Sequence, residues 1–146
     1  MNYLADVNVW IALVAEQHIH HPPGLRWFRN LVNEQLAFCR VTQMGFLRLL
    51  TNKHVMREEV MNPYQAWEAY RILRSDRRVG YMDEPAGLSE FWHSFTQGQA
   101  ASPNLWTDAY LCAFAQAARL TLATFDAKIP KWTGVSCLVL GSAPRI

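Results

Sequence analysis

Three aspartates occupy positions that are usually apolar or that directly follow an apolar run. Asp6 follows the run Tyr3–Ala5, and Asp126 follows the run Leu122–Phe125. Asp108 belongs to the apolar stripe of a predicted helix, whose other members are Leu105, Leu111, Cys112 and Ala115. A buried carboxylate is costly unless a positive charge meets it, and ligands of open α/β sheets gather beyond the carboxyl ends of the strands. Three acids directed at one place predict a hard divalent cation, Mg²⁺ or Mn²⁺, because such cations prefer oxygen ligands.

Each of these acids also has a simpler explanation. Asp108 lies near a helix start, where the helix dipole favours a negative charge, and Asp126 lies in a turn before Lys128. Asn8, two residues after Asp6, can cap the next helix or turn toward the same site as Asp6, and both roles can hold together. The simpler explanations suffice for single residues, but three acids at corresponding ends of neighbouring elements favour a metal site.

A divalent cation held by carboxylates can activate a bound water and stabilise charge on a phosphoryl oxygen. Other chemistries lack their residues, since the chain has no Gly-rich phosphate loop and no Gly-x-Ser-x-Gly nucleophile elbow. The histidines His18, His20 and His21 share one short segment, without the fourth ligand or the i, i+4 pair expected of zinc. A haloacid-type phosphatase would need an acid at the position of Asn8, and a receiver domain would need an acidic pair on the first strand. Of the reactions considered, metal-dependent phosphodiester cleavage is the one that these residues still allow.

The elements that must position these acids alternate between strands and helices. We expect strands at 2–6, 36–39, 79–82, 120–124 and 135–140. We expect helices at 9–17 with Asn8 as N-cap, at 21–32, from an N-cap at Thr42 to residue 50, at 62–73 behind an Asn-Pro start, at 87–95 and at 105–118. Strands separated by helices predict an α/β fold with a mainly parallel central sheet of four to five strands and helices on both faces.

Length and composition predict one globular domain, residues 1–146. Of the 146 residues, 51% are hydrophobic, which is enough to bury a core. A formal charge of +2 neither requires nor excludes a nucleic-acid partner. No apolar run reaches the length of a membrane span, and the first residues do not resemble a signal peptide. The cysteines Cys39, Cys112 and Cys137 form no C-x-x-C pair, so we expect buried reduced thiols in a cytoplasmic protein.

Three segments of the chain resemble the motifs of PIN domains. Asp6–Trp10 (DVNVW) is similar to the first motif, Leu105–Leu111 (LWTDAYL) to the helix motif, and Leu122–Asp126 (LATFD) to the motif at a strand end. Their order and spacing agree with that family over essentially the whole chain. The most similar subgroup is the VapC toxins of bacterial type II toxin–antitoxin pairs.

The resemblance implies a PIN-like three-layer α/β/α fold and a Mg²⁺-dependent endoribonuclease in which Mn²⁺ can replace Mg²⁺. Asp6, Asp108 and Asp126 would be the catalytic acids and the metal ligands, and Asn8 and Thr124 would support them by hydrogen bonds. The resemblance also implies an RNA substrate and a VapB-like antitoxin, and we expect the chain to form a homodimer.

One position departs from the family pattern. PIN domains usually carry a Glu near the start of the helix after the second strand, where this chain has Gly45. Three acids can still hold Mg²⁺, which keeps several waters. Asp83 and Glu84 follow the third strand and could supply the missing charge, or they form a solvated turn. The departure leaves open a catalytically decayed scaffold that only binds RNA or a protein partner, and a nuclease directed at DNA is a third option.

The surfaces that would contact these partners are less clear from the sequence. Basic residues that could contact an RNA backbone are Arg26, Arg29, Arg40, Arg48, Lys53, Arg57, Arg77, Arg78, Lys128 and Lys131. Trp10, Trp27 and Trp132 either stack on unpaired bases or belong to the core. The helices around Trp10–Val14 and Leu25–Val32 could form a groove for a partner helix.

Overall fold

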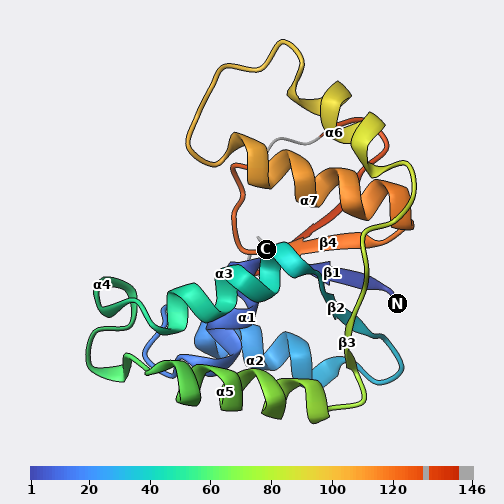
Figure 1. The fold of residues 1–146 in the computed structure, drawn as a ribbon. Coiled ribbons are helices and arrows are strands. Elements are labelled where there is room, and N and C mark those ends of the chain that lie inside the picture. Colours follow the sequence, from blue (N-terminus) through green and yellow to red (C-terminus); the bar gives the residue numbers. More distant parts are fainter. Residues whose placement is uncertain (130–131, 142–146) are drawn as a thin grey trace, which may run out of the picture.

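The sheet at the centre of the molecule has five strands, all parallel. The computed structural model describes residues 1–129 and 132–141 (Figure 1). The strands are β1 (Tyr3–Ala5), β2 (Leu36–Phe38), β3 (Val79–Tyr81), β4 (Thr121–Thr124) and β5 (Ser136–Val139). Their order is β3-β2-β1-β4-β5, so the sheet grows outward from β1 in both directions. The predicted sheet is confirmed, and its order reverses at β1, where ligand sites of such sheets form beyond the carboxyl ends of the strands.

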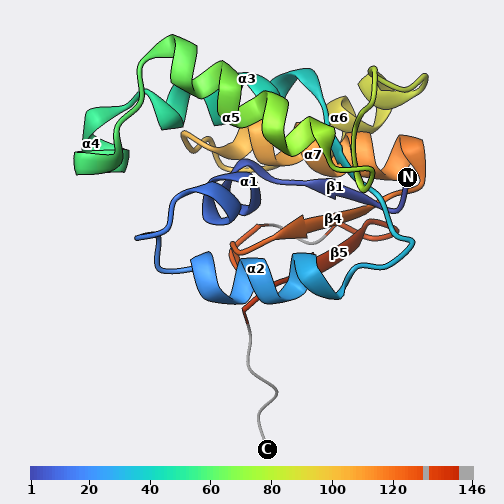
Figure 2. The ribbon, with the colours of Figure 1, turned by 90° about the horizontal axis from the view of Figure 1, so that it is seen from below.

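Helices cover both faces of the sheet, as predicted. They are α1 (Val7–Val14), α2 (His21–Asn30), α3 (Arg40–Leu50), α4 (Lys53–Met56), α5 (Pro63–Ser75), α6 (Leu88–Thr96) and α7 (Leu105–Ala118), with a 3-10 helix at Arg57–Glu59. α6 and α7 lie on one face, and α1, α2, α3 and α5 lie on the other (Figure 1). Figure 2 shows α1 between α2 and the pair formed by α3 and α5. The three-layer α/β/α arrangement is therefore confirmed.

Alternating side chains along the strands divide the core in two. Leu4 and Leu122 belong to the apolar cluster beneath α7, whereas Ala5 and Ala123 belong to the cluster beneath α1. All four are fully buried, because successive residues of a strand point to opposite faces and both faces are covered by helices. For this reason the strand sequences are continuous apolar runs. An acid that follows such a run lies at the edge of the sheet, between the two apolar clusters.

The helix after β1 begins earlier than the sequence predicted. Its N-cap is Asp6, whose Oδ1 accepts a hydrogen bond from the backbone N–H of Val7 at 2.7 Å. The expected N-cap at Asn8 is wrong, and the helix ends at Val14 rather than at residue 17. The strand passes into the helix without a loop, so the first residue after β1 already caps the exposed N–H groups.

The helix after β2 shows the same direct passage from strand to helix. α3 begins at Arg40, behind Cys39 at the N-cap position. Thr42, expected as the N-cap, is the third helical residue, and its hydroxyl accepts a hydrogen bond from the backbone N–H of Cys39 at 2.9 Å. The predicted cap is wrong, although Thr42 does help to start this helix.

The remaining elements agree with the sequence pattern to within one to a few residues. α7 has the predicted bounds, and Asn62 caps α5, with its Oδ1 accepting from the backbone N–H of Gln65 at 2.8 Å. Apolar periodicity did not indicate α4 or the 3-10 helix, because these short segments bury little more than Met56. No helix in the described ranges is long and apolar enough to cross a membrane.

The tryptophans proposed for base stacking contribute to packing. Trp10 is fully buried and stacks on Phe38, with 3.7 Å between ring centroids. Trp27 packs edge-on against Tyr3, and Trp132 stacks on Phe95. Trp10 therefore belongs to the core, and the other two lie half-buried against neighbouring rings.

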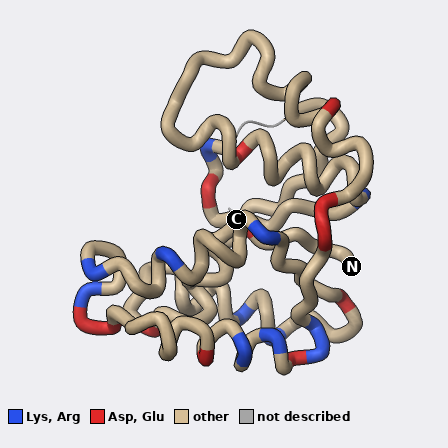
Figure 3. The backbone as a smooth tube through the Cα atoms, in the orientation of Figure 1, with Lys and Arg blue, Asp and Glu red and all other residues tan. Residues whose placement is uncertain are grey.

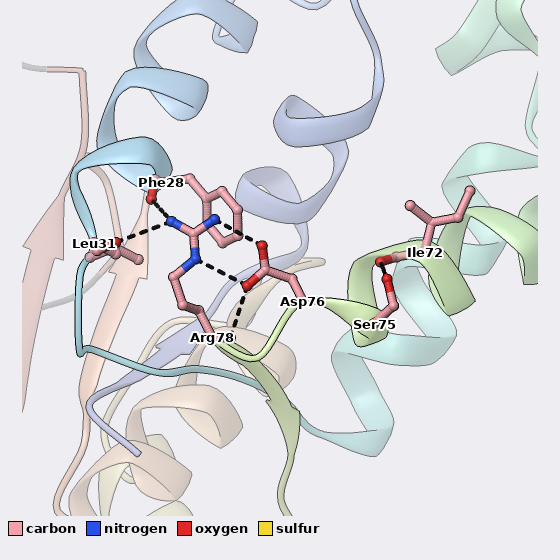
Figure 4. Close-up of polar contacts among 6 residues, drawn as sticks. All are labelled: Phe28, Leu31, Ile72, Ser75, Asp76 and Arg78. Carbon is pink, nitrogen blue, oxygen red and sulfur yellow. Dashed lines mark hydrogen bonds and ion pairs between the residues drawn. The ribbon is translucent and has the colours of Figure 1, made fainter.

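Arg78 joins α2 to the start of β3 (Figure 4). Its guanidinium forms an ion pair with Asp76 at 2.8 Å and donates hydrogen bonds to the backbone carbonyls of Phe28 and Leu31 at 2.8 and 3.1 Å. It also lies 4.0 Å from the centre of the Phe28 ring. The guanidinium of Arg78, one of the basic residues that could contact RNA, therefore connects α2, the end of α5 and β3.

Candidate active site

The topology brings the three predicted acids to one edge of the sheet. Asp6 directly follows β1, and its backbone N–H donates to the carbonyl of Ala123 on β4 at 2.9 Å. Asp126 lies two residues beyond the end of β4. Asp108 lies in the first turn of α7, which leads back along the sheet to β4, so its N-terminus lies at this same edge. The carboxyl edge at β1 and β4 therefore brings Asp6 together with two acids that follow it by more than one hundred residues in sequence.

Thr124 connects the parts of this edge. Its side chain is fully buried, and its hydroxyl donates to Oδ2 of Asp6 at 2.9 Å. The hydroxyl oxygen of Thr124 also accepts hydrogen bonds, from the side-chain amide of Asn8 at 3.3 Å and from the backbone N–H of Asp126 at 3.0 Å. One hydroxyl thus uses its single donor and both acceptors, and it orients Asp6 relative to the turn that carries Asp126.

Asn8 turns toward the site and does not cap the helix. Its carbonyl oxygen accepts from the backbone N–H of Phe125 at 3.2 Å, while its amide donates to Thr124. These two bonds join the first turn of α1 to the end of β4. The predicted supporting role of Asn8 and Thr124 is confirmed as hydrogen bonding, and it keeps the segments around Asp6 and Asp126 in register.

The carboxylates influence one another electrostatically. Burial raises the pKa of Asp6; hydrogen bonds from Thr124 and Val7 lower it in part, and the charge of Asp126 raises it again. Burial raises the pKa of Asp108 from 3.8 to about 6, and the charges of Asp6 and Asp126 add to this rise. The charge of Asp126 thus acts on Asp6, and the charges of Asp6 and Asp126 act on Asp108. A nearby cation would lower both pKa values.

Cys112 lies near the same charges on α7. Burial raises the pKa of its thiol to about 12, and the charges of Cys137, Asp108 and Asp6 act in the same direction. The thiol is therefore protonated at neutral pH and is neither a nucleophile nor a thiolate ligand. Cys39 and Cys112 are buried as expected, whereas Cys137 is half-buried. The three cysteines, all within the described ranges, form no disulfide.

The donor set of this edge suits a hard cation that keeps part of its water shell. Within residues 1–129 and 132–141, no three His, Cys, Asp or Glu side chains are already grouped as a complete metal site. Mg²⁺ is commonly held by one or two carboxylates and several waters, so Asp6 and Asp108 can serve as direct ligands while Asp126 acts through water. The mutual repulsion of the acids is the observation that fits such an ion.

Gly45 lies where α3 packs against the start of α1. A Cβ atom added at this position would lie 2.7 Å from Cγ2 of Val7, the residue that follows Asp6. The position expected to carry the family's acid is thus next to the acidic edge, but the space for a side chain is taken by Val7. A Glu at position 45 would first require Val7 to move, which gives a packing reason for the glycine.

Asp83 and Glu84 do not join the acidic edge. Both are exposed, and Glu84 accepts a hydrogen bond from the Tyr110 hydroxyl at 2.9 Å. The charges that raise the pKa of Asp108 come from Asp6 and Asp126 only. The sequence-based alternative that Asp83 or Glu84 supplies a fourth acid therefore gains no support from the geometry.

The histidines of the α1–α2 connection each contact neighbouring residues. The backbone N–H of His20 donates to Nδ1 of His18, and the ring of His20 stacks on Phe125 at 4.4 Å. Nδ1 of His21 lies 2.6 Å from the carbonyl of Ala12. The stacking supports the turn between Thr124 and Asp126 from outside, a role that the sequence did not predict.

The basic residues expected to contact RNA are spread over several elements. Lys and Arg gather mainly in the part of the molecule that contains α2 to α5 (Figure 3). Lys131 lies outside the described residues. Of the others, Arg40 lies two residues after the end of β2 and is therefore at the same edge as the acids.

Comparison with known proteins agrees with this architecture. The family described as the PIN domain matches residues 3–134. A curated relative from Mycobacterium tuberculosis, Ribonuclease VapC41, is 36% identical over 143 residues, which cover 94% of this chain and 97% of the relative. The chain belongs to the PIN domain family, and the predicted resemblance to VapC proteins is confirmed.

Solved structures share the fold at low sequence identity. The crystal structure of VapBC2 from Rickettsia felis bound to a promoter DNA fragment has a TM-score of 0.65 and 15% identity, covering 97% of this chain and 100% of that chain. VapC20 from Mycobacterium tuberculosis, described as a Sarcin-Ricin loop cleaving toxin, has a TM-score of 0.63 and 18% identity, covering 88% and 92%. These likenesses confirm the α/β fold.

Proposed function

We propose that this chain is a Mg²⁺-dependent endoribonuclease and the toxin of a VapBC-type toxin–antitoxin pair. The observation that carries the proposal is the set of three electrostatically coupled carboxylates, Asp6, Asp108 and Asp126, at the sheet edge where the strand order reverses. The curated relative at 36% identity is a VapC ribonuclease, which supports RNA as the substrate.

The chain's own groups prepare this edge for a phosphodiester. Thr124 and the N–H of Val7 hold the Asp6 carboxylate in one orientation, and the first turn of α7 presents Asp108. Asp126 is fixed by the backbone N–H of Lys128, which donates to its Oδ1 at 2.8 Å. A bound Mg²⁺ supplies a water of lowered pKa and stabilises negative charge on a phosphoryl oxygen.

Cleavage assays test the proposal. Purified protein is incubated with structured RNA in Mg²⁺, in Mn²⁺ and with a chelator, beside a single-stranded DNA of the same sequence. We expect cleavage of RNA that depends on the metal and disappears in Asp108→Asn, whereas Asp83→Asn, an exposed acid outside the trio, keeps activity. RNA binding without cleavage in any metal would instead indicate the decayed scaffold, and cleavage of DNA alone would indicate the third option.

The proposed protein partner is a VapB-like antitoxin. The solved structures with this fold include VapBC-1 from nontypeable Haemophilus influenzae, at a TM-score of 0.65 and 18% identity. We infer the antitoxin partner of this chain from its likeness to the toxins of such complexes. Co-expression with the small reading frame that adjoins the gene should abolish growth inhibition and co-purify both chains. Size-exclusion chromatography of the chain alone tests the expected homodimer.

A further inference from the structure

We propose that Arg40 and Arg74 form a subsite for a backbone phosphate of the RNA strand, next to the acidic edge. The inference rests on the proposed ribonuclease function and names the part of the surface that would position the substrate. Nothing in the sequence pattern indicated Arg74, and Arg40 was only one of many basic candidates.

Both arginines converge on one aromatic ring at the carboxyl end of β3. The guanidinium carbon of Arg40 lies 5.2 Å from the ring centre of Tyr81, and that of Arg74 lies 6.0 Å from the same centre. Arg74 also donates to the hydroxyl of Tyr70 at 2.9 Å. Cation–π contacts and this hydrogen bond hold two exposed guanidinium groups in defined places.

These two cations lack a carboxylate partner in the described part of the chain. The ion pairs there join Arg71 to Glu68 and Arg78 to Asp76. The side-chain hydrogen bonds of Arg40 and Arg74 go to neutral oxygens, those of Gln43 and Tyr70. Two like charges near one ring repel each other, and an anion with several acceptor oxygens would relieve the repulsion. A phosphate fits this need, because guanidinium groups bind it with paired hydrogen bonds.

The strand register places Arg40 near Asp6, and the shared contact with the Tyr81 ring brings the guanidinium of Arg74, from the end of α5, toward Arg40. Leu4 pairs with Ala37 and Phe38 pairs with Tyr81, so continuing the register puts Asp6 level with Cys39, one residue before Arg40. Neighbouring strands lie about 5 Å apart. A strand of RNA that places one phosphate at the acids can therefore place a nearby phosphate at the arginines.

Tyr110 links α7, the helix that carries Asp108, to the segment after β3, because its hydroxyl donates to Glu84 at 2.9 Å. It lies on α7 two residues after Asp108, and it packs against Trp92 with 5.4 Å between ring centres. Burial raises the pKa of its hydroxyl, and the hydrogen bond with Glu84 and the charges of Cys39, Glu84 and Tyr81 act in the same direction. A residue from the helix of Asp108 thus contacts the segment that follows Tyr81, the ring that both arginines approach.

The salt dependence of RNA binding tests the subsite. A short fluorescein-labelled single-stranded RNA is titrated with the full chain in chelator, where no cleavage occurs, and affinity is measured by anisotropy at several salt concentrations. Each phosphate contact contributes about 0.7 to the slope of log K against log salt for single strands. We expect Arg40→Gln and Arg74→Gln each to reduce the slope by about that amount and to weaken binding several-fold.

Matched variants separate a phosphate contact from a general loss of charge. Arg71→Gln removes the same charge from the same helix as Arg74, but Arg71 already pairs with Glu68, so its slope should equal that of the wild type. Arg40→Lys and Arg74→Lys keep the charge and should largely restore the slope. Equal slopes in the wild type and both Gln variants, or an equal loss in Arg71→Gln, would overturn the subsite.

Parallel cleavage assays distinguish this failure from failure of the proposed function. If the wild type cleaves RNA in Mn²⁺ while the Gln variants retain the wild-type slope, the subsite is wrong and the ribonuclease stands. If the wild type neither binds nor cleaves RNA, both are wrong.

Discussion

Replacing Asp108 by Asn should stabilise the metal-free protein while removing its proposed function. The carboxyl of Asp108 has a pKa of about 6 in the folded chain, above its ordinary 3.8, because of burial and the charges of Asp6 and Asp126. An acid whose pKa is raised by folding destabilises the fold once it is ionised, that is, above pH 6. Below pH 4 the group is protonated in both states and the penalty vanishes.

The size of this effect follows from the change in pKa. A rise in the pKa from 3.8 to about 6 means that ionised Asp108 destabilises the folded state by roughly 3 kcal/mol. Asp108 is only half-buried, so solvent screening reduces the expected gain in Asp108→Asn to about 1 kcal/mol. For a domain of this size that is a rise in Tm of about 3 °C at pH 8.

Thermal unfolding followed by circular dichroism in chelator provides the measurement. The difference in Tm between Asp108→Asn and the wild type should be greatest at pH 8 and should disappear between pH 6 and pH 4. Asp83→Asn, which removes an exposed acid, should show no such trend. A difference that is absent at pH 8, or equal at all pH values, would refute the raised pKa of Asp108.

Three further changes test the same edge. Asp6→Asn should abolish Mn²⁺-dependent thermal stabilisation together with RNA cleavage, because it removes a charged ligand; cleavage at the wild-type rate would show that Asp6 is not a ligand. Thr124→Val should lower the free energy of unfolding in urea by roughly 2–4 kcal/mol, because it leaves the Asp6 carboxylate and two donors, the Asn8 amide and the Asp126 N–H, without this partner. A loss below about 1 kcal/mol would contradict the role of the hydroxyl. Gly45→Ala should cost roughly 1–3 kcal/mol through overpacking against Val7, and combining it with Val7→Ala should restore most of this; additive losses in the double variant would show that Val7 is not the obstacle.

Most of the fold could be predicted because each apolar segment has a single periodicity. α7 has helical spacing over its whole length, and the strands are short apolar runs followed by a helix start. The misplaced caps share one cause: Asp6 and Cys39 each end a strand and begin a helix. Propensity alone places a cap at the nearest favourable side chain, whereas the direct passage from strand to helix is set by how the helix packs on the sheet.

The acids of the candidate site could be predicted from their position at the ends of apolar runs or on an apolar helix stripe, and the resemblance to PIN domains indicated Asn8 and Thr124 as hydrogen-bonding support. The partner of each bond could not be predicted: that the Thr124 hydroxyl bonds to three residues at once depends on the pairing of β1 with β4. Likewise, the tight approach of Gly45 to Val7 depends on the packing of two helices. To predict that Arg40 and Arg74 lie close together would have required the register of β2 and β3, since the two residues are far apart in sequence.

The bond between Thr124 and Asp6 spans 118 residues of sequence. The acidic edge therefore does not exist until β4 has been synthesised and has docked beside β1. During translation most of the chain emerges from the ribosome before this can happen, and an unfinished chain ending before residue 121 lacks both Thr124 and Asp126. For the proposed ribonuclease this means that such an incomplete chain would lack one of the three acids and the hydroxyl that orients Asp6, and would not cleave RNA.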